Sequence, residues 1–307
     1  MRQMFMGKRA LVLINKSAGT GKAGNNTFAI ATGLAQRGYE PIVYPIIPGS
    51  GLDSESIIGK YDGLVESIVC SGGDGTLNHV VGAVMDMKNK PVISYIPAGS
   101  TNDFAKGLGI PSVHAAALDV ALDGYPFSYD VGKMNNRYFN YVAAFGAFSK
   151  VSYATDQDLK NIIGYAAYVI SAISELPQSL GYNSHMKIDI DGEIIEDDYV
   201  FGAVCNSGSI GGMNIFGKTD VKLDDGEMEL LLIHAPKNIV EFNEILGALA
   251  TNIDSSNLIT IKQVKKVKFM SETECEWTVD GEFGGAAKET DISVINKAVT
   301  IKVKHKR

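Results

Sequence analysis

The first part of the chain alternates short apolar runs with segments whose apolar residues recur at helical spacing. The apolar runs predict strands at residues 10–15, 41–46, 67–73 and 92–100. The helically spaced segments lie at residues 26–38, 76–86, 101–109 and 114–124. Because strands that alternate with helices usually pair in parallel, this pattern predicts an α/β domain with a parallel sheet. Such sheets bind ligands in the loops after the carboxyl ends of their strands.

The pattern changes near residue 126, after which apolar and polar residues alternate with a period of two. Three segments predict β-hairpins, with turns at residues 135–136, 191–192 and 296–297. Helices are expected at residues 158–175 and 238–252, the second with Asn238 as its N-cap. We therefore predict two domains: an α/β domain at residues 1–127 and a mainly antiparallel β domain at residues 128–307.

The composition of the 307 residues, 45% hydrophobic and 21% charged, is typical of a soluble globular protein. The net charge of −7 argues against a nucleic-acid partner, because phosphate backbones favour basic surfaces. Lysines concentrate at residues 262–268 and 302–306, where either a solvated strand face or contact with anionic lipid headgroups would explain them. No apolar run reaches eighteen residues, so we expect any membrane contact to be peripheral.

The three cysteines, Cys70, Cys205 and Cys275, lie far apart and lack the spacing of metal ligands. Buried, reduced thiols are therefore expected. Few cysteines and the lack of a secretion signal favour a cytoplasmic protein. With peripheral membrane contact, the predicted location is the inner face of the membrane.

Three glycine-containing loops follow the first, third and fourth predicted strands, at residues 16–21, 71–76 and 97–103. Each combines glycine with hydroxyl-bearing residues near a helix start, where unpaired N–H groups and the helix dipole favour an anion. A tight strand-to-helix turn would explain any one loop equally well, but three loops on one sheet edge favour phosphate binding. The first loop is not a Walker A motif, because the four-residue gap before Gly-Lys and the following Ser or Thr are missing, which argues against a standard P-loop NTPase.

Two aspartates, Asp74 and Asp103, lie within these loops. A carboxylate beside a phosphate is repulsive, so the pair suggests a divalent cation between the carboxylates and the phosphates. A favourable charge at a helix N-terminus would also explain Asp103, and a Gly-Asp-Gly turn would also explain Asp74.

Four segments together resemble the diacylglycerol kinase catalytic-domain family, which also contains sphingosine and ceramide kinases. They are LINKSAG at 13–19, SGGDGTLNHV at 71–80, IPAGSTNDFAKGLGIP at 96–111 and VDGE at 279–282. The resemblance implies an ATP-binding α/β domain followed by a β-sandwich that binds the lipid. It also implies transfer of a phosphoryl group from ATP, with Mg²⁺, to the hydroxyl of a membrane lipid, with diacylglycerol as the expected acceptor and phosphatidic acid as the product.

The resemblance also implies roles for individual residues. The catalytic residues would be Asp74 and Asp103 in an acidic cluster and Glu282 as the general base, with Asp130 supporting the cluster. A structural Mg²⁺ would be held by the side chain of Asp225 and the carbonyl groups of Lys222 and Glu227. The expected nucleotide-binding residues are Asn15, Ser17, Gly19, Gly72, Gly73, Asp74, Gly75, Thr76, Asn78, Gly99, Ser100 and Asn102.

Two loops depart from the family pattern, which has NPxSG where this chain has NKSAG and GT where it has Gly99-Ser100. In the loop after residue 46 no nucleotide contact can be assigned. Asp-Gly-Glu occurs at 191–193, 225–227 and 280–282, so spacing does not identify the catalytic glutamate, and Glu282 is chosen from the resemblance alone.

Two other functions stay open at this point. One is a NAD-kinase-like activity on a soluble nucleotide, because related glycine-aspartate motifs occur in NAD kinases. The other is a regulator that binds lipid or nucleotide without turnover. The sequence leaves the oligomeric state, monomer or homodimer, undecided.

Overall fold

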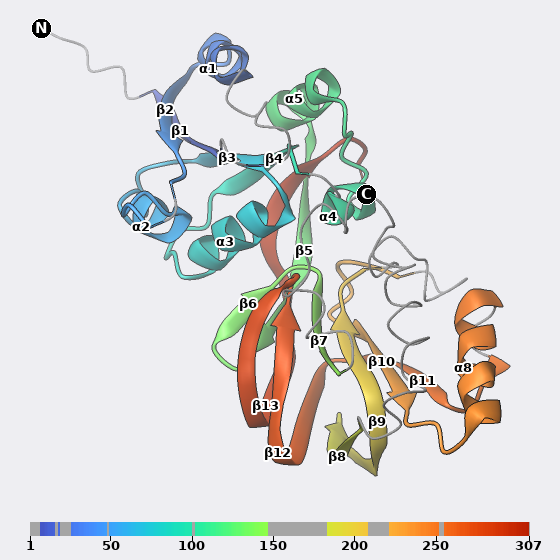
Figure 1. Ribbon diagram of the computed structural model, residues 1–307. Coiled ribbons are helices and arrows are strands. Elements are labelled where there is room, and N and C mark those ends of the chain that lie inside the picture. The colour runs from blue at the N-terminus through green and yellow to red at the C-terminus, as the bar shows by residue number, and fades with distance from the viewer. Residues whose placement is uncertain are drawn as a thin grey trace, which may run out of the picture. The chain divides into compact units, whose positions relative to one another are not determined.

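The computed structural model describes residues 7–15, 18, 26–47, 49–99, 102–146, 183–207, 221–251 and 255–306. The chain divides into two units, and two of its strands, β5 (Tyr125–Met134) and β13 (Glu282–Val303), contribute residues to both (Figure 1). The first comprises Met1–Tyr129 with Lys297–Arg307, and the second comprises Asp130–Asn296. The sequence predicts a division after residue 127 and a second domain that runs to the C-terminus. In the structure strand β5, Tyr125–Met134, passes through the division, so no loop marks it.

The first unit is built on four strands in the order β2, β1, β3, β4, all paired in parallel. Their bounds are Lys8–Ile14 for β1, Tyr39–Pro45 for β2, Ser67–Gly72 for β3 and Val92–Pro97 for β4. The strands β1, β3 and β4 are almost entirely buried, which explains their continuous apolar runs. The burial of these strands shows that both faces of the sheet are covered by other elements.

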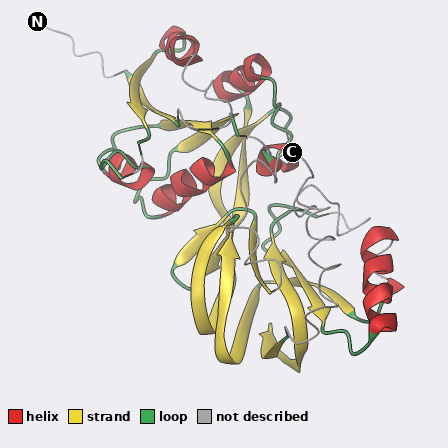
Figure 2. Cartoon of the chain, viewed as in Figure 1, coloured by secondary structure: helices red, strands yellow, loops and turns green. Residues whose placement is uncertain are grey.

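Helices α1, Thr27–Gln36, and α5, His114–Asp123, lie on one face of this sheet (Figure 1). Ile30 of α1 and Ala117 of α5 share one buried cluster with Val12 and Val69 of the sheet. The other face carries α2, Ser54–Gly59, and α3, Asp74–Met85 (Figure 2). The short helix α4, Asp103–Gly107, follows β4. Helix α2 was not predicted, because it is less than two turns long and begins in a glycine-rich loop.

The second unit is antiparallel. It contains the end of β5 and most of β13, with α8 beside the strands (Figure 2). Strands β9 and β12 each change partner along their length: both pair with β8 in one part and with β7 in another. These two long strands therefore join the strands of the unit around one core. The bounds are Arg137–Phe139 for β6, Val142–Gly146 for β7, Ser184–Ile190 for β8, Glu193–Cys205 for β9, Met228–His234 for β10, Ile259–Val264 for β11, Lys266–Val279 for β12 and Glu282–Val303 for β13.

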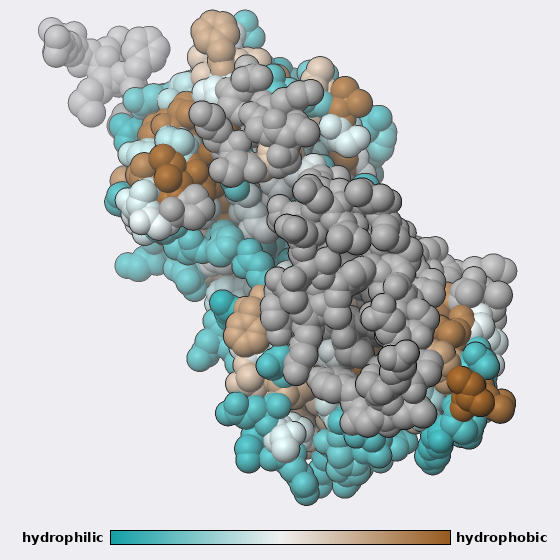
Figure 3. Space-filling model, in the orientation of Figure 1, coloured by the Kyte–Doolittle hydropathy of each residue, from teal (hydrophilic) through white to brown (hydrophobic). Residues whose placement is uncertain are grey.

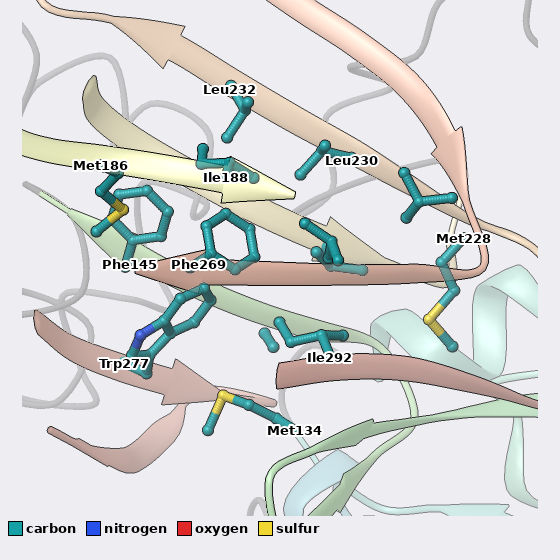
Figure 4. Packing of buried hydrophobic residues seen from close by; sticks show 14 of the residues in the cluster. Met134, Phe145, Met186, Ile188, Met228, Leu230, Leu232, Phe269, Trp277 and Ile292 are labelled. Carbon is teal, nitrogen blue, oxygen red and sulfur yellow. The ribbon is translucent and has the colours of Figure 1, made fainter. Parts of the chain in front are cut away.

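Three aromatic rings form the centre of that core (Figure 4). The ring of Trp277 lies 5.0 Å from the rings of both Phe145 and Phe269, in tilted or edge-to-face arrangements. Such pairs contribute about 0.5–1.5 kcal/mol each beyond the burial of their surface. Met186 and Leu230, from neighbouring strands, belong to the same cluster.

Two of the three predicted hairpins are confirmed. The β5–β6 turn has Asn135 at φ 50°, and the β8–β9 turn has Asp191 at φ 50°. The third prediction, a hairpin at residues 296–297, is wrong, because β13 continues through these residues. Lys297 does adopt a φ of 47°, but a left-handed residue inside a strand can bend it without ending it. Beyond this point Ile301 pairs in parallel with Ile93 of β4.

The predicted N-cap of α8, Ile239–Thr251, is confirmed. The side-chain oxygen of Asn238 accepts hydrogen bonds from the N–H groups of Val240 at 2.9 Å and Glu241 at 3.0 Å. The carboxylate of Glu241 accepts a hydrogen bond from the N–H of Lys237 at 2.7 Å, which completes a reciprocal cap. The helix predicted at residues 158–175 lies outside the described residues.

Candidate active site

The carboxyl ends of β1, β3 and β4 lie side by side, and backbone hydrogen bonds continue past the strands. The N–H of Asn15, just after β1, donates to the carbonyl of Ser71 at 2.9 Å. The N–H of Ala98, just after β4, donates to the carbonyl of Gly72 at 2.7 Å. The loops that leave these strands therefore begin at the same edge of the sheet.

Two of the loops touch through glycines. A Cβ atom at Gly99 would lie 2.7 Å from the Cα atom of Gly73 and 2.9 Å from the side-chain oxygen of Asn102. Real Cβ atoms do not approach backbone this closely. Gly99 is therefore required for the contact between the second and third loops. Because neither glycine has a side chain, a phosphate could approach the backbone N–H groups at this contact directly.

Asn102 holds the third loop closed. Its side-chain oxygen accepts a hydrogen bond from the N–H of Gly99 at 2.9 Å, and its amide nitrogen donates to the carbonyl of Gly99 at 2.7 Å. Asn102 itself has a φ of 48°, a left-handed conformation that asparagine tolerates better than most residues. The structure thus gives this predicted nucleotide contact a role in shaping the loop.

A further hydrogen bond connects the first loop to helix α3. The amide nitrogen of Asn15 donates to the hydroxyl oxygen of Thr76 at 2.8 Å. Both residues were predicted to contact nucleotide, and the structure brings them together. Asn78 follows one turn behind Asp74 and is half-buried.

Helix α3 begins at this edge with Asp74, directly after Gly73 in an extended conformation. Because the N-cap is glycine, no side chain at this position caps the first-turn N–H groups. These groups and the helix dipole produce a positive potential at the glycine loops. The half-buried Asp74 adds a carboxylate at the same place, 3.5 Å from the hydroxyl of Tyr95.

Four predicted residues cannot be placed at this site. Ser17, Gly19 and Ser100 lie outside the described residues. For Asp103 the structure describes only the backbone, which begins α4. Their roles stay predictions.

In the second unit Asp130 is fully buried and joins three segments. Its carboxylate accepts hydrogen bonds from the N–H of Gly226 at 2.6 Å and from the side-chain nitrogen of Asn296 at 2.9 Å. Its own N–H donates to the carbonyl of Leu223 at 2.7 Å, and its carbonyl accepts from the side chain of Asn206 at 2.6 Å. Asp130 thereby fixes the segment that contains Asp225. Asn206 and Asn296 were not predicted, since no spacing or motif in the sequence relates them to Asp130.

The predicted Mg²⁺ loop at residues 222–227 carries Asp225, which is exposed and accepts a hydrogen bond from the N–H of Glu227 at 3.1 Å. Among the described residues, no three acidic, histidine or cysteine side chains lie close enough to hold a metal ion. The predicted set is compatible with this finding, because two of its three ligands are carbonyl oxygens.

Two buried oxygens beside this loop lack hydrogen-bond partners in the part of the chain that the structure describes. They are Oδ1 of Asn206, next to Asp130, and Oε2 of Glu229 at the start of β10. Burial, together with the charges of Asp225 and Glu227, raises the pKa of Glu229 to about 7. The loop therefore has an excess of negative charge and of oxygen acceptors, which fits a bound cation. Sequence analysis missed Glu229, although a lone acid in the apolar run MELLLI was a visible signal.

Glu282 follows a tight turn between β12 and β13, where Asp280 has a φ of 49° and Gly281 a φ of 85°. The carboxylate of Asp280 accepts hydrogen bonds from three consecutive backbone N–H groups, those of residues 140–142, at 2.8–2.9 Å. This turn is therefore held firmly, and it presents Glu282 as an exposed residue. Glu193, which follows the corresponding Asp-Gly turn at residues 191–192, is also exposed and forms an ion pair with Lys262 at 2.7 Å.

Four of the C-terminal lysines have partners within the fold. Lys262, Lys265 and Lys268 each form an ion pair with a glutamate, at 2.7, 3.5 and 2.6 Å. Lys302 donates to the backbone carbonyls of residues 121 and 122. A solvated, charge-paired strand face explains these residues better than a lipid-binding patch. No helix within the described ranges is long and apolar enough to cross a membrane.

Comparisons with known proteins agree with this arrangement. The model of the diacylglycerol kinase catalytic domain matches residues 9–134. The model of the YegS C-terminal NAD kinase beta sandwich-like domain matches residues 142–303. The two matches confirm a catalytic domain followed by a β-sandwich-like domain.

Relatives and solved structures cover nearly the whole chain. Diacylglycerol kinases of Staphylococcus aureus strains RF122 and MRSA252 are each 32% identical over 284 residues, which cover 91% of this chain and 88% of theirs. A crystal structure from Bacillus anthracis strain Sterne has a TM-score of 0.81 at 24% identity and covers 97% of this chain and 95% of its own. The crystal structure of a diacylglycerol kinase from the same strain has a TM-score of 0.73 at 22% identity, covering 97% and 98%. Both structures share the fold, and the family matches establish that the chain is a kinase of the diacylglycerol kinase catalytic-domain family.

Proposed function

We propose that this kinase transfers the γ-phosphoryl group of ATP to the hydroxyl of a membrane lipid, with diacylglycerol as the acceptor and phosphatidic acid as the product. The observation that carries the proposal is the contact of Gly73 with Gly99 beside Asp74 at the start of α3. This arrangement suits a polyphosphate, and the relatives that match along most of the chain are diacylglycerol kinases.

The glycine loops and the start of α3 would bind the ATP phosphates through backbone N–H groups. Asp74, together with Asp103, would hold Mg²⁺ against the phosphates. When bound, Mg²⁺ would offset part of the phosphate charge. The carboxylate of Asp74 fits this role because it lies beside N–H groups that attract the phosphates themselves. Phosphoryl transfer depends mainly on such alignment and charge neutralisation.

Glu282 would act as the general base. The oxygen of the lipid hydroxyl attacks the γ-phosphorus, its proton passes to the carboxylate of Glu282, and ADP leaves with the bridging oxygen. The exposed position of Glu282 after a firmly held turn supports this role, because a base must reach its substrate without losing its orientation.

We also propose that Asp225, with the carbonyl groups of Lys222 and Glu227, holds a structural Mg²⁺. The unpartnered buried oxygens of Asn206 and Glu229 and the local negative charge support a cation at this loop. Its role would be to hold the segment that Asp130 anchors through Gly226.

A lipid acceptor requires contact with the membrane surface. Exposed apolar side chains lie at the first turn of α8, where Ile239 is 58% and Val240 72% exposed. The space-filling view shows hydrophobic surface in the region where Figure 1 places α8 (Figure 3). The exposed Lys237 precedes them and would be attracted to anionic headgroups by about 1 kcal/mol. We propose that this end of α8 contacts the membrane.

The test is to incubate the pure protein with labelled ATP, Mg²⁺ and a panel of acceptors, and then to identify the phosphorylated product. The panel contains diacylglycerol, sphingosine and ceramide in mixed micelles, and NAD in solution. We expect labelled phosphatidic acid. Labelled sphingosine phosphate or ceramide phosphate would show that the acceptor is a lipid other than diacylglycerol, and the proposal of a lipid kinase would stand.

The NAD arm is included because the second family model is described as NAD kinase beta sandwich-like. NADP formation without any phosphorylated lipid would replace the proposal by a nucleotide kinase. ATP binding without turnover on any acceptor would replace it by a regulator.

A further inference from the structure

Tyr95 of β4 is a buried tyrosine whose hydroxyl points at the second glycine loop. It is only 1% exposed. Its hydroxyl oxygen lies 3.2 Å from the carbonyl oxygen of Gly72 and 3.5 Å from Oδ1 of Asp74. Tyr95 pairs directly with Cys70 of β3, so both side chains lie on the same face of the sheet. A polar group at this depth needs a partner, and both of its partners belong to the proposed phosphate site.

The hydroxyl of Tyr95 remains a donor under physiological conditions. The ordinary pKa of a phenol is about 10, so the hydroxyl keeps its proton at neutral pH. An ionised Asp74 and the carbonyl of Gly72 can only accept hydrogen bonds. The hydroxyl of Tyr95 can therefore donate its single proton either to the carbonyl of Gly72 or to the carboxylate of Asp74.

We propose that Tyr95 is a positioning residue of the nucleotide site, whose hydroxyl orients the Asp74 carboxylate toward the phosphates and cation of bound ATP. This inference rests on the proposed function, because it assumes that Asp74 serves the nucleotide. Tyr95 itself is buried beneath the loop and does not touch the nucleotide.

The physical reason is that Asp74 occupies a place where its carboxylate has competing partners. An aspartate in the first turn of a helix can rotate toward the helix N–H groups, which would remove it from a ligand. A donor fixed in a buried strand opposes that rotation. Residues that orient a metal-binding or catalytic group in this way typically contribute on the order of 10-fold to affinity or activity.

The experiment compares the Tyr95→Phe, Asp74→Asn and double variants with the wild type by calorimetric titration of ATP, with and without Mg²⁺. We expect Tyr95→Phe to weaken ATP binding in the presence of Mg²⁺ on the order of 10-fold. In the Asp74→Asn background the same change should have almost no further effect, because the hydroxyl acts through the carboxylate. Tyr95→Phe keeps the ring, and Gly72 keeps its hydrogen bond from Ala98, so the variant should fold.

The matched control is Tyr199→Phe. Tyr199 of β9 is equally buried at 1% exposure, and its ring packs against His234 in the second unit. This variant should bind ATP like the wild type.

Two results would overturn the inference. In the first, Tyr95→Phe binds ATP as tightly as the wild type although Asp74→Asn binds it more weakly. In the second, Tyr95→Phe lowers the ATP affinity by the same factor in the wild type and in the Asp74→Asn background. A different result, wild-type ATP binding and turnover by Asp74→Asn, would instead remove Asp74 from the proposed function.

Discussion

Gly99 illustrates how a single missing side chain shapes the site. Its Cα approaches Gly73 so closely that a methyl group would lie 2.7 Å from backbone. We expect Gly99→Ala to push the two loops apart and to weaken ATP binding about 10-fold, which corresponds to about 1.4 kcal/mol. Equilibrium titration with ATP and Mg²⁺ would measure this.

Gly82 provides the control for this substitution. It lies inside α3, and a Cβ atom there would have no neighbour within 4 Å. Gly82→Ala should leave ATP binding unchanged and stabilise the protein by about 0.5–1 kcal/mol. Equal ATP affinities of the Gly99→Ala and Gly82→Ala proteins would contradict the phosphate role of the glycine contact.

Glu282 is predicted to carry the proton transfer. Glu282→Gln keeps the shape of the side chain but cannot accept a proton at neutral pH. We expect the turnover number to fall about 10²- to 10⁴-fold with little change in ATP affinity. The control, Glu193→Gln, changes the same residue type after an Asp-Gly turn and should retain activity. Near wild-type turnover by Glu282→Gln would remove this residue from the mechanism.

His185 gives a prediction of pH dependence. Its Nδ1 atom lies 2.9 Å from Asp198 and its Nε2 atom 3.2 Å from Glu196, and the pKa of His185 is raised by Asp198 first and Glu196 second. A raised histidine pKa means that the ion pairs stabilise the fold fully below about pH 6.5. This stabilisation is lost as pH rises through the folded-state pKa. An NMR titration should find the His185 pKa above 6.5 and lower in Asp198→Asn, and an unchanged value in that variant would contradict the assignment.

At the scale of elements, α8 combines a reciprocal cap with an exposed apolar first turn. Its inner residues, including Phe242 and Ile245, pack on β9 and β10, so the exposed pair is not needed for that packing. We expect the Ile239→Ser, Val240→Ser double variant to bind anionic vesicles on the order of 100-fold more weakly, because each buried aliphatic side chain contributes about 1.5–3 kcal/mol. Sedimentation with phosphatidylglycerol vesicles would measure this.

The control for α8 is Phe28→Ser. Phe28 of α1 is 83% exposed, and so it is an equally accessible apolar residue on another element. This variant should bind vesicles normally. If the α8 variant also binds normally, α8 is not the membrane contact.

At the scale of the whole molecule, the loop at residues 222–227 should link magnesium to stability. A ligand that binds only the folded state, at a free concentration 100 times its dissociation constant, stabilises the folded state by about 2.7 kcal/mol. We expect chelation by EDTA to lower the Tm of the wild type by several degrees, since about 1 kcal/mol corresponds to 2–4 °C in a chain of 150–250 residues. Asp225→Asn should abolish this response in thermal denaturation without ATP.

The neighbouring Asp224→Asn is the matched control, because it removes the same charge from the same loop without removing a predicted ligand. It should keep the response to EDTA. Loss of the response in both variants would show that charge, not ligation by Asp225, causes it.

Much of the fold follows from local patterns in the chain. Continuous apolar runs identified β1, β3 and β4, helical spacing identified α1, α3 and α5, and Asn-Asn and Asp-Gly pairs identified two hairpins. These signals are readable because each depends on residues close together in sequence. The turn at residues 296–297 was misjudged, because a left-handed residue has the same sequence signature in a hairpin as inside a continuous strand.

The sequence by itself determined the family, the element types of the first unit and the residues that leave its strand ends. Motifs of adjacent residues contain this information. Only the tertiary structure decided that Lys297–Arg307 joins the first unit, that Tyr95 lies beneath Asp74, and that Asp130 meets Gly226 and Asn296. These contacts join residues up to 166 positions apart. Long-range pairing is set by how whole elements pack, and no local pattern of residues specifies it.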